Sequence, residues 1–136
     1  MNLSKSKFCR GKQCLKMLWL DTHKPELADN SLMNEAVLAT GNKVGDLAMG
    51  YYGAYKEVPY AQDKTQMLQT TQELLRQGEP TICEASFAYA KNFCSVDILR
   101  VFADGVDIIE VKSSTDIHDI YYYDMAYQYY VVSHAG

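Results

Sequence analysis

Asp97, Glu110 and Lys112 have types and spacing that could do chemistry together. Glu110 and Lys112 lie two residues apart in the stretch IIEVKSST (108–115), which begins like a buried strand. Alternate side chains of a strand point to the same face, so the two charges are predicted to face the same way. Burying charge is costly unless the charge is paired or binds a metal ion. Asp97 lies in an apolar stretch that would pair with this strand, so its carboxylate and that of Glu110 could converge on one divalent cation.

Carboxylate oxygens suit Mg²⁺ or Mn²⁺. Such an ion lowers the pKa of a bound water and stabilises charge on a phosphoryl oxygen. Lys112 could orient that water or offset developing negative charge. The set could therefore hydrolyse a phosphodiester. The pattern D-x(12)-E-x-K is loose, however, and it also fits a buried Glu–Lys pair beside a turn aspartate. Spacing alone leaves both interpretations open.

Three neighbouring segments must position these residues. Residues 81–90, 93–102 and 105–114 are short runs rich in β-branched and aromatic residues, separated by KN and ADG. Such runs with short turns predict an antiparallel meander.

Helical segments are predicted on both sides of this meander. Ser4 can cap a short helix that breaks at Gly11 and resumes up to Trp19. The segment 119–136 is rich in tyrosine, which favours strands, but its spacing favours a helix that begins at Asp119 and ends at Gly136. Two further helices are predicted from apolar spacing and glycine stops: residues 31–53, with Met33, Val37, Val44, Leu47 and Ala48 on one face, and residues 64–79. The face predicted for the last helix consists of Ile120, Tyr123, Tyr127, Tyr130 and Val131.

Composition and charge bound the class of protein. The chain of 136 residues predicts one α+β domain, with a helical arm at 1–22 and a core at 30–136. It has no long apolar run and no apolar stretch typical of a signal peptide, so we expect a cytoplasmic protein with no membrane partner, and its four cysteines reduced or metal-bound. Residues 1–20 carry five basic residues and no acid, which fits phosphate contact but equally fits a solvated helix. These five are Lys5, Lys7, Arg10, Lys12 and Lys16.

The stretches VDIL, IIEVKSST and DIYYYDMAYQYYV together resemble the core of the PD-(D/E)XK nuclease superfamily in its RecB-like branch. They are most similar to a family of uncharacterised bacterial proteins related to the CRISPR-associated RecB-like exonucleases. LSKSKFCRGKQCLKMLWL resembles that family's opening, TGNKVGDLA its first helix, and ICEASFAY the strand before the catalytic aspartate. The resemblance spans nearly the whole chain and implies a restriction-endonuclease-like core.

The resemblance implies a metal-dependent deoxyribonuclease, exonuclease-like, that uses Mg²⁺ or Mn²⁺. Asp97 and Glu110 would be metal ligands and Lys112 the catalytic lysine. Gln128 would meet DNA or the active site, although an ordinary exposed helix glutamine is the alternative. Glu84 would supply a further carboxylate, or would be a plain surface residue. Asp124, one turn before Gln128, could share its face.

Three departures from the family pattern shape the expectations. A histidine that helps to bind metal in many relatives is replaced by Gly45, which motivates a second hypothesis, a catalytically weak or inactive nucleic-acid-binding module. A structural domain that binds neither DNA nor metal is a third. Cys14 matches an early iron–sulfur ligand of the relatives, but no cysteine follows Cys94, so no cluster is expected in this chain alone. The core strand that follows the last helix is missing, so we expect part of a longer protein or a homo-oligomer formed through an open sheet edge.

Overall fold

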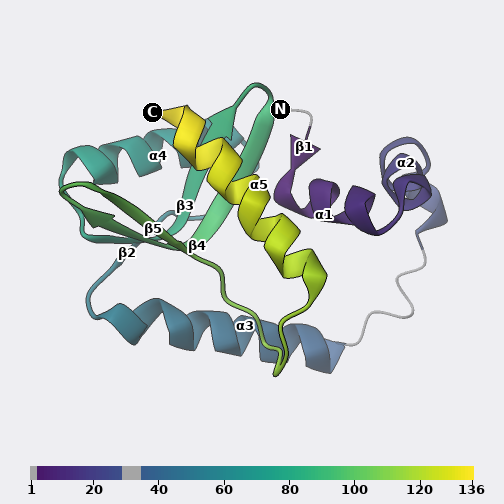
Figure 1. Cartoon of the computed structure of the whole chain (residues 1–136), viewed down its shortest axis with the longest axis horizontal. Coiled ribbons are helices and arrows are strands. Elements are labelled where there is room, and N and C mark those ends of the chain that lie inside the picture. The colour runs from purple at the N-terminus through teal and green to yellow at the C-terminus, as the bar shows by residue number, and fades with distance from the viewer. Residues whose placement is uncertain (1–2, 29–34) are drawn as a thin grey trace.

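The computed structural model describes residues 3–28 and 35–136. Within these residues the protein is a mixed α+β structure, as predicted, in which a curled open sheet is flanked by helices (Figure 1). The predicted meander is confirmed. It consists of β3 (Thr81–Tyr89), β4 (Asn92–Phe102) and β5 (Gly105–Ile109), all paired antiparallel.

Two short strands that the sequence did not predict extend the sheet. β1 (Leu3–Ser4) pairs parallel with β4, and β2 (Lys56–Glu57) pairs parallel with β3. Strands of two residues are too short to show a periodic pattern. Because β3 occupies one edge of β4, β1 and β5 share the other edge. β1 lies beside the start of β4 and β5 beside its end, which leaves the stretch around Asp97 between them.

The N-terminal segment forms two helices, α1 (Lys5–Gln13) and α2 (Leu15–His23), and a 3₁₀ turn at Pro25–Leu27. Ser4 caps α1 as predicted and accepts a hydrogen bond from the backbone N–H of Lys7 at 3.3 Å. The break lies at Cys14, whose backbone is extended, and not at Gly11. Gly11 instead permits close packing, since a Cβ there would lie 2.9 Å from Leu18 Cδ2.

The next helices are α3 (Glu35–Met49), followed by a 3₁₀ turn at Gly50–Tyr52, and α4 (Lys64–Arg76). The predicted buried face of α3 is wrong at Leu47, which is 79% exposed. Met33 of that face lies outside the described residues. α4 is capped by Asp63, which accepts from the backbone N–H of Thr65 at 2.9 Å. The predicted glycine stop is confirmed, since Gly78 follows the end of α4 in a left-handed conformation.

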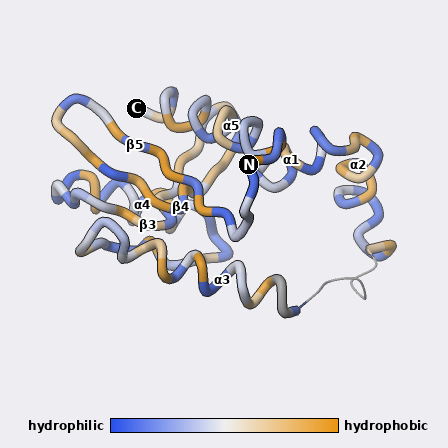
Figure 2. The backbone as a smooth tube through the Cα atoms, turned by 60° about the horizontal axis from the view of Figure 1, so that its bottom comes forward, coloured by the Kyte–Doolittle hydropathy of each residue, from blue (hydrophilic) through white to orange (hydrophobic). Residues whose placement is uncertain are grey.

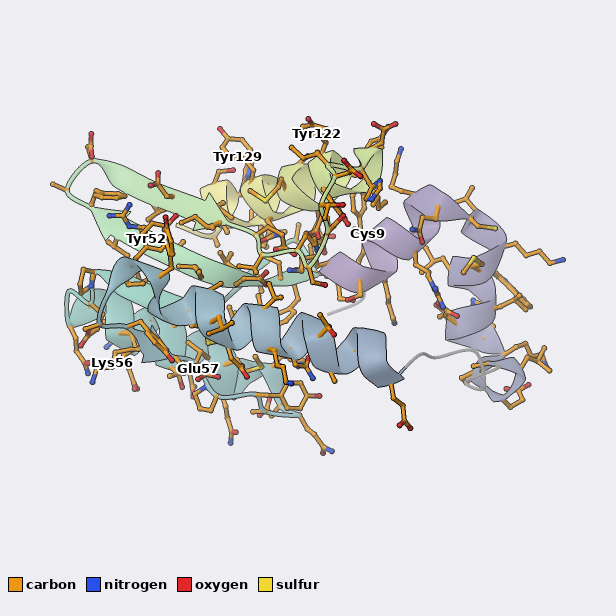
Figure 3. All side chains as sticks on the ribbon, turned by 90° about the horizontal axis from the view of Figure 1, so that it is seen from below. Cys9, Tyr52, Lys56, Glu57, Tyr122 and Tyr129 are labelled. Atoms are coloured by element: carbon orange, nitrogen blue, oxygen red, sulfur yellow. The ribbon has the colours of Figure 1, made fainter. Side chains whose placement is uncertain are left out.

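α5 (Asp119–Ala135) lies across the sheet and contacts β3 and β4 (Figure 1). The prediction of its buried face was wrong in part. The buried residues are Asp124, Tyr127, Gln128 and Val131, whereas Tyr123 and Tyr130 are partly exposed. Hydrophobic spacing missed the two polar members, because they are buried by hydrogen bonding and not by apolar packing. On the outer side of α5, Tyr122 and Tyr129 project away from the sheet (Figure 3).

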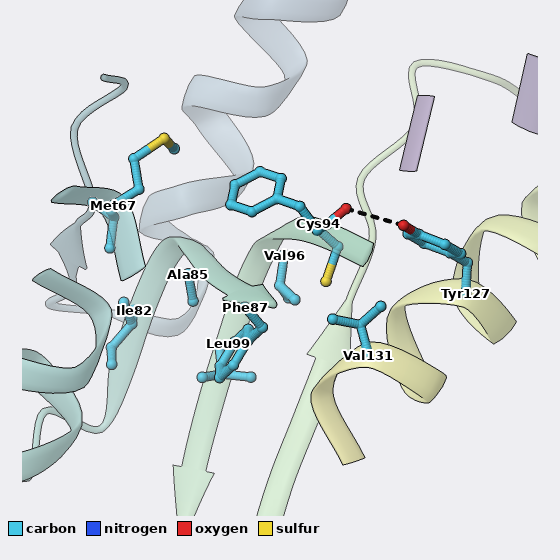
Figure 4. Close-up of a cluster of buried hydrophobic side chains, with 11 residues drawn as sticks. Met67, Ile82, Ala85, Phe87, Cys94, Val96, Leu99, Tyr127 and Val131 are labelled. Carbon is cyan, nitrogen blue, oxygen red and sulfur yellow. Dashed lines mark hydrogen bonds between the residues drawn. The ribbon is translucent and has the colours of Figure 1, made fainter. Parts of the chain in front are cut away.

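The core joins the sheet to α4 and α5 through Met67 of α4 and Tyr127 and Val131 of α5 (Figure 4). The most apolar stretches of the chain lie on the strands, and the N-terminal helices carry more polar residues (Figure 2). Tyr127 also joins β1 to β4, since its hydroxyl donates to the carbonyl oxygen of Leu3 at 3.0 Å and to that of Phe93 at 3.3 Å. Across residues 3–28 and 35–136, no helix has the length and apolar character needed to cross a membrane.

Candidate active site

The candidate site lies where β1 and β5 end beside β4. Ile109, the last residue of β5, pairs with Ile98, so the next residue, Glu110, arrives beside Asp97. The backbone N–H of Val111 then donates to Asp97 Oδ2 at 2.8 Å. This side-chain acceptor ends the ladder. Glu110 and Lys112 therefore lie just past β5, and the prediction that they lie within the strand is wrong. They still face each other, with Lys112 Nζ 2.5 Å from Glu110 Oε1.

Asp97 and Glu110 share one cation, the ammonium of Lys5. Lys5 Nζ lies 2.9 Å from Glu110 Oε2, 3.2 Å from Glu110 Oε1 and 3.5 Å from Asp97 Oδ1. Burial lowers the pKa of Lys5, but attraction to Asp97 and Glu110 outweighs burial and leaves that pKa raised. The two carboxylates therefore converge as predicted. The cation between them is Lys5, which was predicted to contact phosphate and not to belong to the site.

Lys112 is held by two carboxylates. Its ammonium donates to Glu110 and, at 2.9 Å, to Asp124 Oδ2. Burial of Lys112 lowers its pKa, but these hydrogen bonds raise it well above the ordinary value. For the acid Asp124 the signs are opposite. Burial raises its pKa, but the hydrogen bond from Lys112 outweighs burial and leaves that pKa lowered. Both groups are therefore charged near neutral pH.

Gln128 is fully buried, so the alternative of an exposed helix glutamine is wrong. Its Nε2 donates to Glu110 Oε2 at 2.7 Å and to Asp124 Oδ1 at 3.0 Å. Among the residues that the structure describes, Oε1 of Gln128 has no hydrogen-bond partner. α5 thus contributes two polar residues, one turn apart, that hold Glu110 and Lys112 in place.

On its other side Asp97 lines a cavity of about 270 Å³ between α3 and the sheet, together with Gly45, Asp46 and Glu84. Glu84 lies on β3 with φ of 55°, a left-handed conformation that is strained for a residue other than glycine. Burial and repulsion from Asp97 raise the pKa of Glu84. Gly45, at the place of the family's histidine, faces open space, since a Cβ there would meet nothing within 4 Å.

The charges of the site favour a further cation. Asp97, Glu110 and Asp124 carry three negative charges, and Lys5 and Lys112 carry two positive ones, so the set is −1 before Glu84 is counted. In the described part of the chain, no three His, Cys, Asp or Glu side chains group closely enough to hold a metal ion. Mg²⁺ commonly binds through one or two carboxylates with water completing its shell. Asp97 and Glu110 supply two carboxylates of this kind, and the ammonium of Lys5 lies between them.

The five basic residues of the N-terminal segment lie in different environments. Lys5 belongs to the site, Arg10 Nε pairs with Asp21 Oδ2 at 2.9 Å, and Lys12 Nζ lies 4.1 Å from the ring centre of Tyr123. Lys7 and Lys16 are exposed, and no ion pair joins them to residues 3–28 or 35–136. The predicted DNA contact by these five residues stays a prediction, and Lys7 and Lys16 are the two whose exposed charges are not engaged within the described residues.

The four cysteines are free thiols in different environments. Cys83 and Cys94 are fully buried in β3 and β4, and burial raises their pKa to about 11 and about 12. Cys9 and Cys14 are half-buried on the N-terminal segment. The buried pair is therefore protonated and unsuited to bind metal as thiolate.

Lys5 was not predicted as a member of the site because its partners lie 92 and 105 residues away in sequence. No local pattern carries that information. The spacing of Asp124, four residues before Gln128, did indicate that the two side chains share a helix face. The contact that ties Asp124 to the site, its hydrogen bond from Lys112, was not predicted.

Comparison of the chain with protein-family models, with curated proteins and with solved structures found no match in any of the three.

Proposed function

We propose that this protein is a metal-dependent nuclease domain, with a restriction-endonuclease-like core, that hydrolyses phosphodiester bonds of DNA in an exonuclease-like manner. One observation carries the proposal: the carboxylates of Asp97 and Glu110 converge on a single cation, the ammonium of Lys5, and Lys112 lies beside them. Such hydrolysis needs two carboxylates, here Asp97 within β4 and Glu110 just past the end of β5, and a fixed lysine.

Asp97 and Glu110 would hold the metal ion, with Glu84 as a further carboxylate across the adjacent cavity. When bound, Mg²⁺ or Mn²⁺ would supply a water of lowered pKa and neutralise charge on a phosphoryl oxygen. Lys112 and Gln128 each donate to one oxygen of Glu110 and so restrict the rotation of its carboxylate. This pre-orients the carboxylate for the ion.

Lys112 would act on the reacting groups. Its ammonium is charged and fixed by Glu110 and Asp124, so it offers a preformed positive charge to a nucleophilic water or to the developing negative charge on phosphate. Lys7 and Lys16, which are exposed, would contact the phosphate backbone at a distance from the site.

A second candidate is a module of the same fold that binds nucleic acid without cutting it. Gly45 in place of a histidine and the lysine between the two carboxylates favour this alternative. Both features would lower metal affinity. The two candidates differ in turnover and not in DNA binding.

The deciding experiment measures Mn²⁺ binding by calorimetry and cleavage of end-labelled single- and double-stranded DNA. We expect binding and cleavage by the wild type, and loss of metal affinity by about 100-fold or more in Asp97→Asn, since even outer-shell substitutions cost about 10- to 100-fold. Asp104→Asn, in the exposed β4–β5 turn, is the matched control and should change neither. Mn²⁺ binding without cleavage at any metal concentration would favour the binding module. Unchanged Mn²⁺ affinity in Asp97→Asn would refute the site.

A further inference from the structure

The ammonium of Lys5 lies at the point that both proposed metal ligands reach. Its distances are 2.9 and 3.2 Å to the oxygens of Glu110 and 3.5 Å to Asp97. The Lys5 side chain is only 21% exposed and that of Glu110 only 6%. A solvated surface lysine would not be held by two carboxylates at this depth.

The backbone of Lys5 is fixed by contacts that do not involve its charge. β1 pairs with β4 through Leu3 opposite Asn92 and Ser4 opposite Phe93. The carbonyl of Leu3 accepts from Tyr127, and the ring of Phe8 stacks on Tyr127 with centroids 4.8 Å apart. Lys5 is thus the first residue of an anchored helix, while its flexible four-carbon stem leaves the ammonium free to move.

We propose that Lys5 is a tethered cation that occupies the metal position in the metal-free protein, and that a divalent ion binds only by displacing it. This inference rests on the proposed metal site. The ammonium and a divalent ion would compete for the same carboxylate oxygens and would repel each other at this separation. If neither cation were present, the negative charges of Asp97 and Glu110 would lie close together with no positive charge between them, which is unfavourable.

Two consequences follow from the tether. Lys5 stabilises the metal-free fold and at the same time weakens metal binding. A divalent ion therefore fills the site only at a concentration high enough to displace the Lys5 ammonium. Because β1 and α1 remain anchored, the displaced ammonium stays beside the site as a positive charge.

The test compares the wild-type chain with Lys5→Met, which keeps the length of the stem and removes the charge, and with Lys5→Arg, which keeps the charge. Lys7→Met, on the exposed side of the same helix, is the matched control. Each protein is titrated with Mn²⁺ by calorimetry and is unfolded thermally in EDTA. We expect Lys5→Met to bind Mn²⁺ about tenfold more tightly, the factor that corresponds to loss of one competing charge-assisted hydrogen bond. It should also melt at a lower temperature in EDTA. Lys5→Arg and Lys7→Met should resemble the wild type in Mn²⁺ affinity.

The outcomes separate this inference from the proposed function. Equal Mn²⁺ affinity in wild type and Lys5→Met, with binding lost in Asp97→Asn, would overturn the competition and leave the metal site standing. Absence of Mn²⁺ binding in the wild type and in Lys5→Met alike would overturn both, and a lowered melting temperature in EDTA would then define Lys5 as a structural ion-pair partner. Binding by Lys5→Met and not by the wild type would support strong competition.

Discussion

The two sides of Asp97 differ in how their charges are balanced. On the side of β5 and α5, Glu110 and Asp124 are each paired with a lysine at 2.9 Å or closer. On the side of α3, Asp46 and Glu84 line the same cavity as Asp97, and no ion pair joins either of them to another residue that the structure describes.

This difference explains the geometry of each side. Paired charges on the β5 side fix their side chains, so the orientation of Lys112 and Glu110 is set before any ligand arrives. On the α3 side, burial raises the pKa of Glu84, and repulsion from Asp97 adds to this rise. A cation bound near Asp97 would be attracted most strongly by the α3 side, where, among the described residues, the carboxylates are not paired with a lysine.

The largest effect is expected from Lys112→Ala on the β5 side. Removing a preorganised charge at the reacting groups should lower turnover by about 10²- to 10³-fold. Mn²⁺ affinity should be kept, because Lys112 is not a metal ligand. Single-turnover cleavage and calorimetry on the same sample check both parts. Loss of Mn²⁺ binding in this variant would mean that Lys112 maintains the site and does not act in the reaction.

Asp124→Asn should have the next largest effect. The substitution keeps the shape of a buried side chain and removes the charge that binds Lys112. We expect a loss of about 1.5 to 3 kcal/mol in the free energy of unfolding, the value of a hydrogen bond to a charged group. Turnover should fall about tenfold, because Lys112 is less well oriented. Urea unfolding and cleavage assays measure these changes.

The control for Asp124→Asn is Asp119→Asn, at the exposed start of the same helix. Its effect on stability should be a few tenths of a kcal/mol, since it removes only a favourable interaction with the helix dipole. Equal destabilisation by the two substitutions would contradict a specific Lys112–Asp124 contact.

On the α3 side, Gly45→His should add a metal ligand where a side chain has room. We expect Mn²⁺ affinity to rise about tenfold, a gain of about 1.4 kcal/mol. Gly45→Ala is the matched control, and it should raise the free energy of unfolding by about 0.5 to 1 kcal/mol through helix propensity alone, with no change in affinity. An affinity that rises equally in both variants would assign the effect to the helix and not to the imidazole.

The smallest effect is expected from Glu84→Gln, which removes repulsion from the α3 side. If Glu84 contributes to metal binding, Mn²⁺ affinity should fall only by a few-fold, because water can replace a distant ligand of Mg²⁺ or Mn²⁺. Thermal stability in EDTA should rise slightly, since Asp97 loses an unfavourable neighbour. A Mn²⁺ affinity that is unchanged within error would remove Glu84 from the site.

Several features could be predicted from the sequence because they depend on local pattern. The meander β3–β4–β5 follows from short β-branched runs and tight turns, and the helix that carries Gln128 follows from its spacing. The pairing of β4 with β5 brings Glu110 next to Asp97. These steps require only the periods of strand and helix and the shortness of the connections.

The tertiary structure decided the features that depend on distant partners. The Asp97 side chain ends β5 at Ile109 by accepting the Val111 N–H, which no period in the sequence encodes. Asp124 accepts from Lys112 and Gln128 donates to Glu110, so these buried residues are held by polar contacts and an apolar pattern overlooks both. Lys5 enters the site because the two-residue strand β1 docks on the same edge of β4 as β5. Local sequence specifies the elements, but the pairing of charges across them depends on which elements share an edge.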